Sequence, residues 1–155
     1  MEITFQKSRV DAGPGGALVG AMRKEVADVY AGLELDGANM PKAGPVELGP
    51  PGGALIVGWC DNEPICCGGF KKLSDGGCEI KRMFVLPTMR GRGVARVLLR
   101  ELERRARQHG YTVARLDTGP LQPHARSLYE SEGYKPVANF NANPVATFFG
   151  EKSLS

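Results

Sequence analysis

Apolar residues in the first third of the chain follow two different periods. Residues 3–9 alternate weakly between apolar and polar, which predicts a strand. Over residues 16–31 apolar positions recur every three or four residues, the spacing of one helix face, so a helix is predicted there. Residues 37–53 are rich in Gly and Pro and predict a long loop, a kind of segment that is usually functional or disordered.

Three strands joined by short turns are predicted in the middle of the chain. They cover residues 54–60, 65–72 and 78–86, and turn-forming residues occupy 61–64 and 74–77 between them. Connections this short join antiparallel neighbours, so the pattern predicts an antiparallel meander.

The C-terminal third contains the clearest helical pattern, over residues 94–109. Its predicted apolar face consists of Ala95, Leu98, Leu99, Leu102 and Ala106. Gly110 follows as a helix-ending glycine would. Residues 111–117 predict a strand that returns to the sheet after this helix and is therefore parallel to the strand before it. The remaining predicted elements are a short helix over residues 123–132 and strands over 134–138 and 145–153.

The chain of 155 residues is long enough for a sizeable core, and we expect one domain covering residues 1–155. No apolar run reaches the roughly 18 residues of a membrane span. Residues 1–7 lack the basic and then apolar pattern of a signal peptide. We therefore expect a cytoplasmic protein with no membrane partner.

The four cysteines favour a structural interpretation. They form no Cys-x-x-Cys pair, and the chain has only two histidines, so no metal site is predicted. All four fall within predicted strands, and in a cytoplasmic protein they are expected to be small buried hydrophobes.

Positive charge is concentrated in one segment. Residues 81–126 hold eleven Lys or Arg and only three Asp or Glu, whereas the whole chain has a net charge of +3. Such a segment suits a polyanion, either a nucleotide cofactor or a nucleic acid. Within the predicted helix, Glu101 and Glu103 stand four residues before Arg105 and Arg107, which predicts two ion pairs.

The turn over residues 90–95, Arg-Gly-Arg-Gly-Val-Ala, joins a predicted strand to a predicted helix. The first N–H groups of a helix lack backbone partners and carry partial positive charge, which makes this position suitable for a phosphate. Glycine lets a ligand approach the backbone closely. The alternative is an ordinary strand–turn–helix corner with exposed arginines.

Two familiar phosphate-binding loops do not fit this turn. No Gly-Lys pair follows it, as a P-loop requires. Gly91-x-Gly93 is followed by Arg96 where a dinucleotide fingerprint needs a third small residue.

Two motifs at matching distances together resemble one family. The turn fits the pattern Gln/Arg-x-x-Gly-x-Gly/Ala, and residues 123–134 fit Asn-x-x-Ala-x-x-Leu-Tyr-x-x-x-Gly-Phe/Tyr, with Gln122 in the place of the usual Asn. Both are similar to motifs of the GNAT superfamily of acyl-CoA-dependent N-acyltransferases. The resemblance covers residues 54–138 well and the chain looks like one of the small bacterial members. It implies an α/β (α+β) fold: a mixed, mostly antiparallel sheet flanked by helices, with a splayed parallel strand pair at the CoA site.

The resemblance also implies a co-substrate, acetyl-CoA, although some relatives transfer longer acyl groups such as succinyl. The turn would hold its pyrophosphate, and the backbone of Met83 and Val85 would bond the pantetheine arm in the gap between the strand ending near residue 85 and the strand over residues 111–117. The cofactor-binding residues implied in this way are Met83, Phe84, Val85, Arg90, Gly91, Arg92, Gly93, Val94, Ala95, Gln122, Ala125 and Tyr129.

Direct transfer of an acetyl group to an amine needs a base and an acid. Tyr129 matches the family tyrosine that protonates the leaving thiolate, and its alternative role is that of a core tyrosine. Glu79 and Asp117 each match a position at which some relatives place the base, and Glu79 is slightly favoured. The alternatives are a solvated strand end for Glu79 and a turn-capping carboxylate for Asp117.

The acceptor is expected to be a small-molecule or peptide amine bound by residues 22–53. The carboxylates there would suit a polyamine, an aminoglycoside or a peptide amine, but they would equally suit a solvated helix face.

A non-catalytic acyl-CoA sensor is the main alternative function. Nucleic-acid binding is not expected, because the basic segment lacks interleaved aromatics. The sequence is compatible with a monomer and with a homodimer. Phe140, Phe148 and Phe149 could form a dimer surface or belong to the core.

Overall fold

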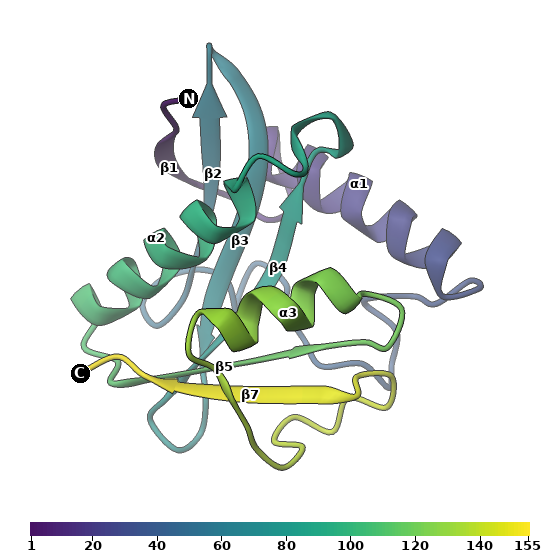
Figure 1. The fold of residues 1–155 in the computed structure, drawn as a ribbon, viewed down its shortest axis with the longest axis vertical. Coiled ribbons are helices and arrows are strands. Elements are labelled where there is room, and N and C mark those ends of the chain that lie inside the picture. The colour runs from purple at the N-terminus through teal and green to yellow at the C-terminus, as the bar shows by residue number, and fades with distance from the viewer.

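The computed structural model describes residues 1–155 and consists of a seven-stranded sheet with helices on both faces (Figure 1). The strand order is β1-β2-β3-β4-β5-β7-β6. This arrangement confirms the predicted mixed α/β architecture. The elements are β1 (Thr4–Ser8), α1 (Gly13–Val29), β2 (Ala54–Cys60), β3 (Glu63–Lys72), β4 (Cys78–Val85), the 3-10 turn η1 (Pro87–Met89), α2 (Val94–Gln108), β5 (Val113–Thr118), α3 (Pro123–Ser131), β6 (Lys135–Pro136) and β7 (Phe148–Ser153).

Strands β2, β3 and β4 form the predicted antiparallel meander. The pair β4–β5 is the one parallel pair of the sheet, as the crossover through α2 requires. It is paired only at Cys78–Ala114 and Glu79–Arg115. Beyond these two positions the strands separate, so the backbone of the second half of β4 faces a gap, and Figure 1 shows β5 and β7 running away from β4.

A β-bulge interrupts the pairing of β4 with β3. Cys67 is opposite Phe84, whereas Gly69 is opposite Lys81, so β4 carries one extra residue. Arg82, at this point, has a φ of 59°, in the left-handed region. A bulge changes the faces to which the following side chains point. The sequence pattern did not predict it.

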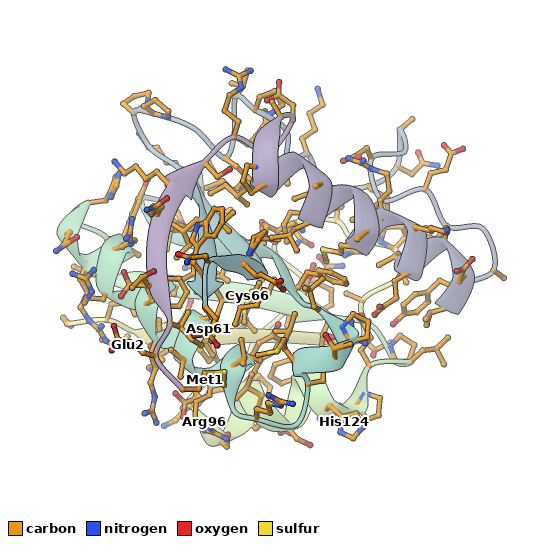
Figure 2. All side chains as sticks on the ribbon, turned by 90° about the horizontal axis from the view of Figure 1, so that it is seen from above. Met1, Glu2, Asp61, Cys66, Arg96 and His124 are labelled. Carbon is orange, nitrogen blue, oxygen red and sulfur yellow. The ribbon has the colours of Figure 1, made fainter.

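The two faces of the sheet bury two separate clusters. Strand β2 divides its residues between them: Ala54 and Ile56 pack with α2 on one face, and Leu55 and Val57 pack with α1 on the other. Because successive side chains of β2 are buried on opposite faces of the sheet, the strand is apolar along almost its whole length. Figure 2 shows α1 on one side of the sheet and Arg96 of α2 and His124 of α3 on the opposite side.

Several element boundaries differ from those predicted, each for a local reason. Helix α1 begins at Gly13 rather than residue 16, because Pro14 occupies its first turn and Ser8 Oγ accepts a hydrogen bond from Gly15 N. Strand β7 begins at Phe148 rather than residue 145, because the side chain of Asn143 caps the preceding backbone.

The loop after α1 has no helix or strand, as predicted, but it is anchored. Leu35, Ala43 and Leu48 are buried, and Lys71 Nζ donates to the carbonyl of Lys42 at 2.6 Å. At the C-terminal end of the chain, Phe148 belongs to the core. None of the helices has both the length and the apolar character needed to cross a bilayer.

Candidate active site

A cavity of about 150 Å³ lies where β4 and β5 separate. Its walls come from α1 and the loop that follows, from the bulged part of β4, from the end of β5, from α3 and from residues 143–146. The residues that line it include Met22, Val26, Tyr30, Leu33, Leu35, Met40, Lys81, Arg82, Met83, Asp117, Gln122, Ala125, Tyr129 and Asn143. The cavity therefore reaches from the α1 face of the sheet to the α3 face.

The turn before α2 presents a row of free backbone donors. The N–H groups of residues 91–96 donate to no carbonyl and to no side chain of the protein, and the helix has no side-chain cap. Gly91 and Gly93 have φ values of 78° and 79°, a conformation that other residues adopt only with strain. No atom lies within 4 Å of the position where a Cβ would be in either glycine. The turn is thus open, and its amides can bind an anion.

The two arginines of the turn differ in their surroundings. Arg92 is exposed and makes no ion pair. Arg90 instead points toward α1, where its Nη2 lies 2.8 Å from Glu25 Oε2, and its Nε donates to the carbonyl of Val85 at 3.0 Å. Its guanidinium also lies over the ring of Phe84, 5.5 Å from the centroid. Arg90 and the Val85 carbonyl, both predicted to contact acetyl-CoA, therefore already have protein partners.

Tyr129 of α3 is brought to the cavity together with two other predicted residues, Gln122 and Ala125. Its residue exposure is 8%, and its hydroxyl lies 3.9 Å from the sulfur of Met83. Burial, and secondly the charge of Asp117, raise the pKa of Tyr129 above that of an ordinary phenol. The phenol is therefore protonated over the whole physiological pH range.

Gln122 precedes α3 and is tied to α1. Its Oε1 accepts a hydrogen bond from the hydroxyl of Tyr30 at 3.2 Å, and the same hydroxyl accepts one from Leu121 N at 3.2 Å. A Cβ on Gly119 would lie 2.2 Å from this hydroxyl, so only glycine fits beside it. Tyr30 thus fixes the start of α3, and with it Tyr129, against the first helix.

Glu79 is fully buried, which differs from the solvated strand end considered in the sequence analysis. Its Oε2 lies 3.2 Å from Lys81 Nζ, and its Oε1 lies 3.9 Å from Lys71 Nζ without any hydrogen bond. It does not line the cavity.

Asp117, at the end of β5, does line the cavity. Its Oδ2 accepts hydrogen bonds from the side chains of Asn141 and Asn143, at 2.7 and 3.0 Å. Asn141 Nδ2 also donates to Glu79 Oε2 at 2.8 Å, so one amide joins both candidate bases. The sequence reasoning missed these asparagines; the alternation Asn139-x-Asn141-x-Asn143 was the available signal.

The carboxylates of residues 22–53 do not face the cavity. Glu25 pairs with Arg90, Asp36 pairs with Arg23 and Arg82, and Glu47 accepts a hydrogen bond from Gly44 N. Asp117 is the single carboxylate among the lining residues. The wall formed by α1 and its loop is instead mostly apolar.

Much of the positive charge of residues 81–126 is neutralised by carboxylates from elsewhere in the chain. Arg96 and Arg100 share Glu132, and Arg115 pairs with Asp75 and Glu151. No group of three or more His, Cys, Asp or Glu side chains is arranged to hold a metal ion. The site therefore combines an anion-binding turn, a buried phenol and a carboxylate around one cavity.

Comparison with known proteins agrees with this arrangement. Residues 24–134 match the family model described as acetyltransferase (GNAT). The chain is 33% identical over 111 residues to IAA acetyltransferase of Azospirillum brasilense, an alignment that covers 69% of this chain and 72% of that relative. It is 30% identical over 101 residues to an N-acetyltransferase of Schizosaccharomyces pombe, covering 64% of this chain and 62% of the relative.

Solved structures share the fold over almost the full chain. One of them carries the name acyl-CoA N-acyltransferase and comes from Klebsiella pneumoniae. It superposes on this chain with a TM-score of 0.75 at 26% identity, covering 99% of this chain and 98% of that one. The PaiA N-acetyltransferase of Thermoplasma acidophilum, solved in complex with coenzyme A, gives a TM-score of 0.69 at 16% identity, covering 99% of both chains. The latter similarity establishes the fold alone.

Proposed function

Since the chain belongs to the GNAT acetyltransferase family, we propose that it transfers the acetyl group of acetyl-CoA directly to an amine. The observation that carries this proposal is the row of six unpartnered backbone N–H groups, residues 91–96, at one end of the gap between β4 and β5. The cavity with Tyr129 and Asp117 lies along the same gap. One extended molecule with a phosphate at one end and a thioester at the other fits this order of features.

In this proposal the pyrophosphate of acetyl-CoA binds to the amides of the turn, with charge from Arg92. Arg90 adds its charge if the incoming phosphate displaces Glu25, an exposed partner whose contribution is small. The pantetheine arm follows the backbone of Met83–Val85, where β4 has lost its pairing with β5. Gln122 and Ala125 border the arm from the side of α3.

The chemical step needs a neutral amine and a protonated leaving group. Asp117, which lines the cavity, accepts the proton of the incoming ammonium directly or through a water molecule. The amine nitrogen then attacks the thioester carbonyl carbon and a tetrahedral intermediate forms. Its nitrogen, which carries a positive charge after the attack, releases its second proton to water as the carbon–sulfur bond breaks. Tyr129 donates its phenolic proton to the departing thiolate and is reprotonated from solvent. Buried Glu79 supports Asp117 through Asn141 rather than meeting the amine itself.

The test is a thiol-release assay with acetyl-CoA and a panel of amines, combined with a thermal shift measured with acetyl-CoA alone. Acetylation of an amine together with a shift supports the proposal. A thermal shift without turnover on any amine would indicate an acyl-CoA-binding module without catalytic activity. The absence of both turnover and a thermal shift would refute the proposed binding site.

A further inference from the structure

The part of the cavity beneath α1 is apolar apart from its cations. Its wall there is formed by Met22, Val26, Leu33, Leu35 and Met40. Lys81 and Arg82, both from the bulged region of β4, line the same cavity. An apolar pocket with a few fixed polar groups is typical of a site for a small molecule, in which the polar groups set orientation and specificity.

Arg82 has an unused hydrogen-bond donor in this buried position. Its side chain is 4% exposed, and Nη2 donates to Asp36 Oδ1 at 3.0 Å. Its Nε is buried and has no partner. A buried N–H group without a partner costs free energy, and in native proteins such a group calls for an explanation such as a bound molecule.

Several cations lie close to this donor. Arg23 and Arg82 share one carboxylate, that of Asp36. Lys71 and Lys81 likewise share the carboxylate of Glu79. An anionic group beside Arg82 would therefore be attracted, whereas a polyamine or an aminoglycoside would bring further positive charge to a buried cation.

We propose that the acceptor is a small α-amino acid with an apolar side chain, whose carboxylate accepts a hydrogen bond from Arg82 Nε. This inference rests on the proposed function and specifies its acceptor. The α-amine is separated from the carboxylate by one carbon, so binding at Arg82 holds it in the same cavity as Asp117. The apolar side chain contacts the wall beneath α1. A cavity of about 150 Å³ suits such a molecule better than a drug-sized ligand.

The selectivity of such a site follows from desolvation. A substrate that lacks the carboxylate leaves the Arg82 donor buried and unpaired, and sites built around a specific hydrogen bond discriminate strongly against such analogues. Hydrogen bonds between a guanidinium and a carboxylate are among the stronger ones in proteins.

The test compares leucine with isopentylamine, which is the same amine without its carboxylate, and with leucinamide. We expect kcat/KM to be highest for leucine. Because the carboxylate also changes the basicity of the amine, the decisive quantity is how the leucine-to-isopentylamine preference changes in Arg82→Met. We expect this preference to fall at least tenfold, chiefly through loss of activity on leucine. Arg82→Lys, which keeps the charge, should retain part of the preference.

Arg9→Met is the control, since it removes an exposed guanidinium that is paired with Asp11 outside the cavity. It should leave the preference unchanged. If wild type and Arg82→Met have the same preference, the inference is wrong. If leucinamide reacts as fast as leucine in the wild-type enzyme, the acceptor is a peptide amine rather than a free amino acid, which also overturns it.

A binding measurement separates this inference from the proposed function. In the presence of CoA, calorimetry should show that N-acetylleucine binds at least tenfold more tightly than N-isopentylacetamide, and this difference should vanish in Arg82→Met. Equal binding of the two products would overturn the inference even if no turnover is detected or Arg82→Met does not fold. Failure to bind acetyl-CoA would instead overturn the proposed function.

Discussion

Glu79 and Asp117 accept hydrogen bonds from the same side-chain amide, Nδ2 of Asn141, at 2.8 and 2.7 Å. They come from the two parallel strands of the sheet, just before and just after these strands separate. A fully buried carboxylate and a carboxylate of the cavity wall are thereby held in one network. Asn141 is a positioning residue in this arrangement, since it does not line the cavity itself.

Asn141→Ala should lower kcat more than it raises the KM for acetyl-CoA. It removes a donor from two carboxylates, and hydrogen bonds to charged groups contribute about 1.5–3 kcal/mol each. A tenfold or larger fall in kcat is expected from steady-state kinetics. The combination with Asp117→Asn should be clearly less than additive, because both changes break the same network. Additive effects would show that Asn141 does not act through Asp117.

Tyr129→Phe should lower kcat by about 10²-fold or more while the affinity for acetyl-CoA changes little, because general acid catalysis typically contributes about 10²–10⁴-fold. Calorimetry and steady-state kinetics measure the two effects separately. Because the pKa of Tyr129 is raised, ionisation of this phenol should not reduce kcat as the pH is increased to about 10.

Tyr134→Phe is the matched control. The two rings are 6.1 Å apart, but the Tyr134 hydroxyl donates to Glu103 at 2.7 Å on the side of the core. Its loss should decrease the free energy of unfolding and leave kcat near the wild-type value. A similar fall in kcat in both variants would argue that Tyr129 acts through packing rather than as an acid.

The sequence predicted the fold well where the hydrophobic period was regular. Strand β2 was predicted with its observed bounds, and α2 ends within one residue of its prediction, because Gly110 adopts a φ of 92° after it. The bulge at Arg82 was not predicted, because it depends on the register between two strands rather than on the residues of one. Lys81 and Arg82 were therefore not predicted to line the cavity, whereas Met83 beside them was predicted as a cofactor-binding residue.

The backbone conformation of the turn before α2 follows from the sequence better than the side-chain contacts around it do. The turn with Gly91 and Gly93 has the expected open conformation. Arg90, by contrast, pairs with Glu25, 65 residues away in the sequence, and no local pattern encodes such a contact. The same holds for the contact of Asn141 with Glu79.

Glu103 should be important for stability although it lies on a helix rich in surface charges. The predicted pair with Arg107 is not formed; Glu103 is 2% exposed and accepts hydrogen bonds from Tyr134 and Lys152. Lys152→Met leaves this carboxylate buried without its cation, which should decrease the free energy of unfolding by about 3–5 kcal/mol. Denaturant titration measures the change.

Arg104→Met provides the control for this pair. Arg104 is half-exposed and forms a surface ion pair with Glu101, which typically contributes at most about 1 kcal/mol. Equal destabilisation by the two substitutions would show that Glu103 is solvated in solution.

The cysteines should differ sharply in reactivity. Cys66, Cys67 and Cys78 are buried, and burial raises the pKa of Cys66 to about 11 and those of Cys67 and Cys78 to about 12. Cys60 is partly exposed. A chromogenic disulfide reagent should therefore label one thiol per native chain and all four in denaturant. Rapid labelling of more than one would show that the strands open readily.

The same thiols make stability depend on pH. Unfolded thiols ionise near pH 8.5, whereas the native ones stay protonated until about pH 11 or 12. Their raised native pKa values thus contribute stability that is fully present below pH 8.5 and is lost as the pH rises through the native values. The urea midpoint should fall between pH 8.5 and 11, and replacing Cys67 by Ala should weaken this dependence.

Gly93→Ala should weaken the binding of acetyl-CoA about tenfold, which corresponds to about 1.4 kcal/mol. Gly93 has a φ of 79°, a conformation that costs an alanine about 1–2 kcal/mol, so the turn would relax and move its free N–H groups. Gly76→Ala is the matched control: its φ is 91°, its Cβ also meets no atom within 4 Å, and it lies in the β3–β4 turn far from α2 in the sequence. Both variants should lose similar stability in denaturant titration. Only Gly93→Ala should lose affinity for acetyl-CoA in calorimetry, and unchanged affinity in that variant would place the pyrophosphate elsewhere than on this turn.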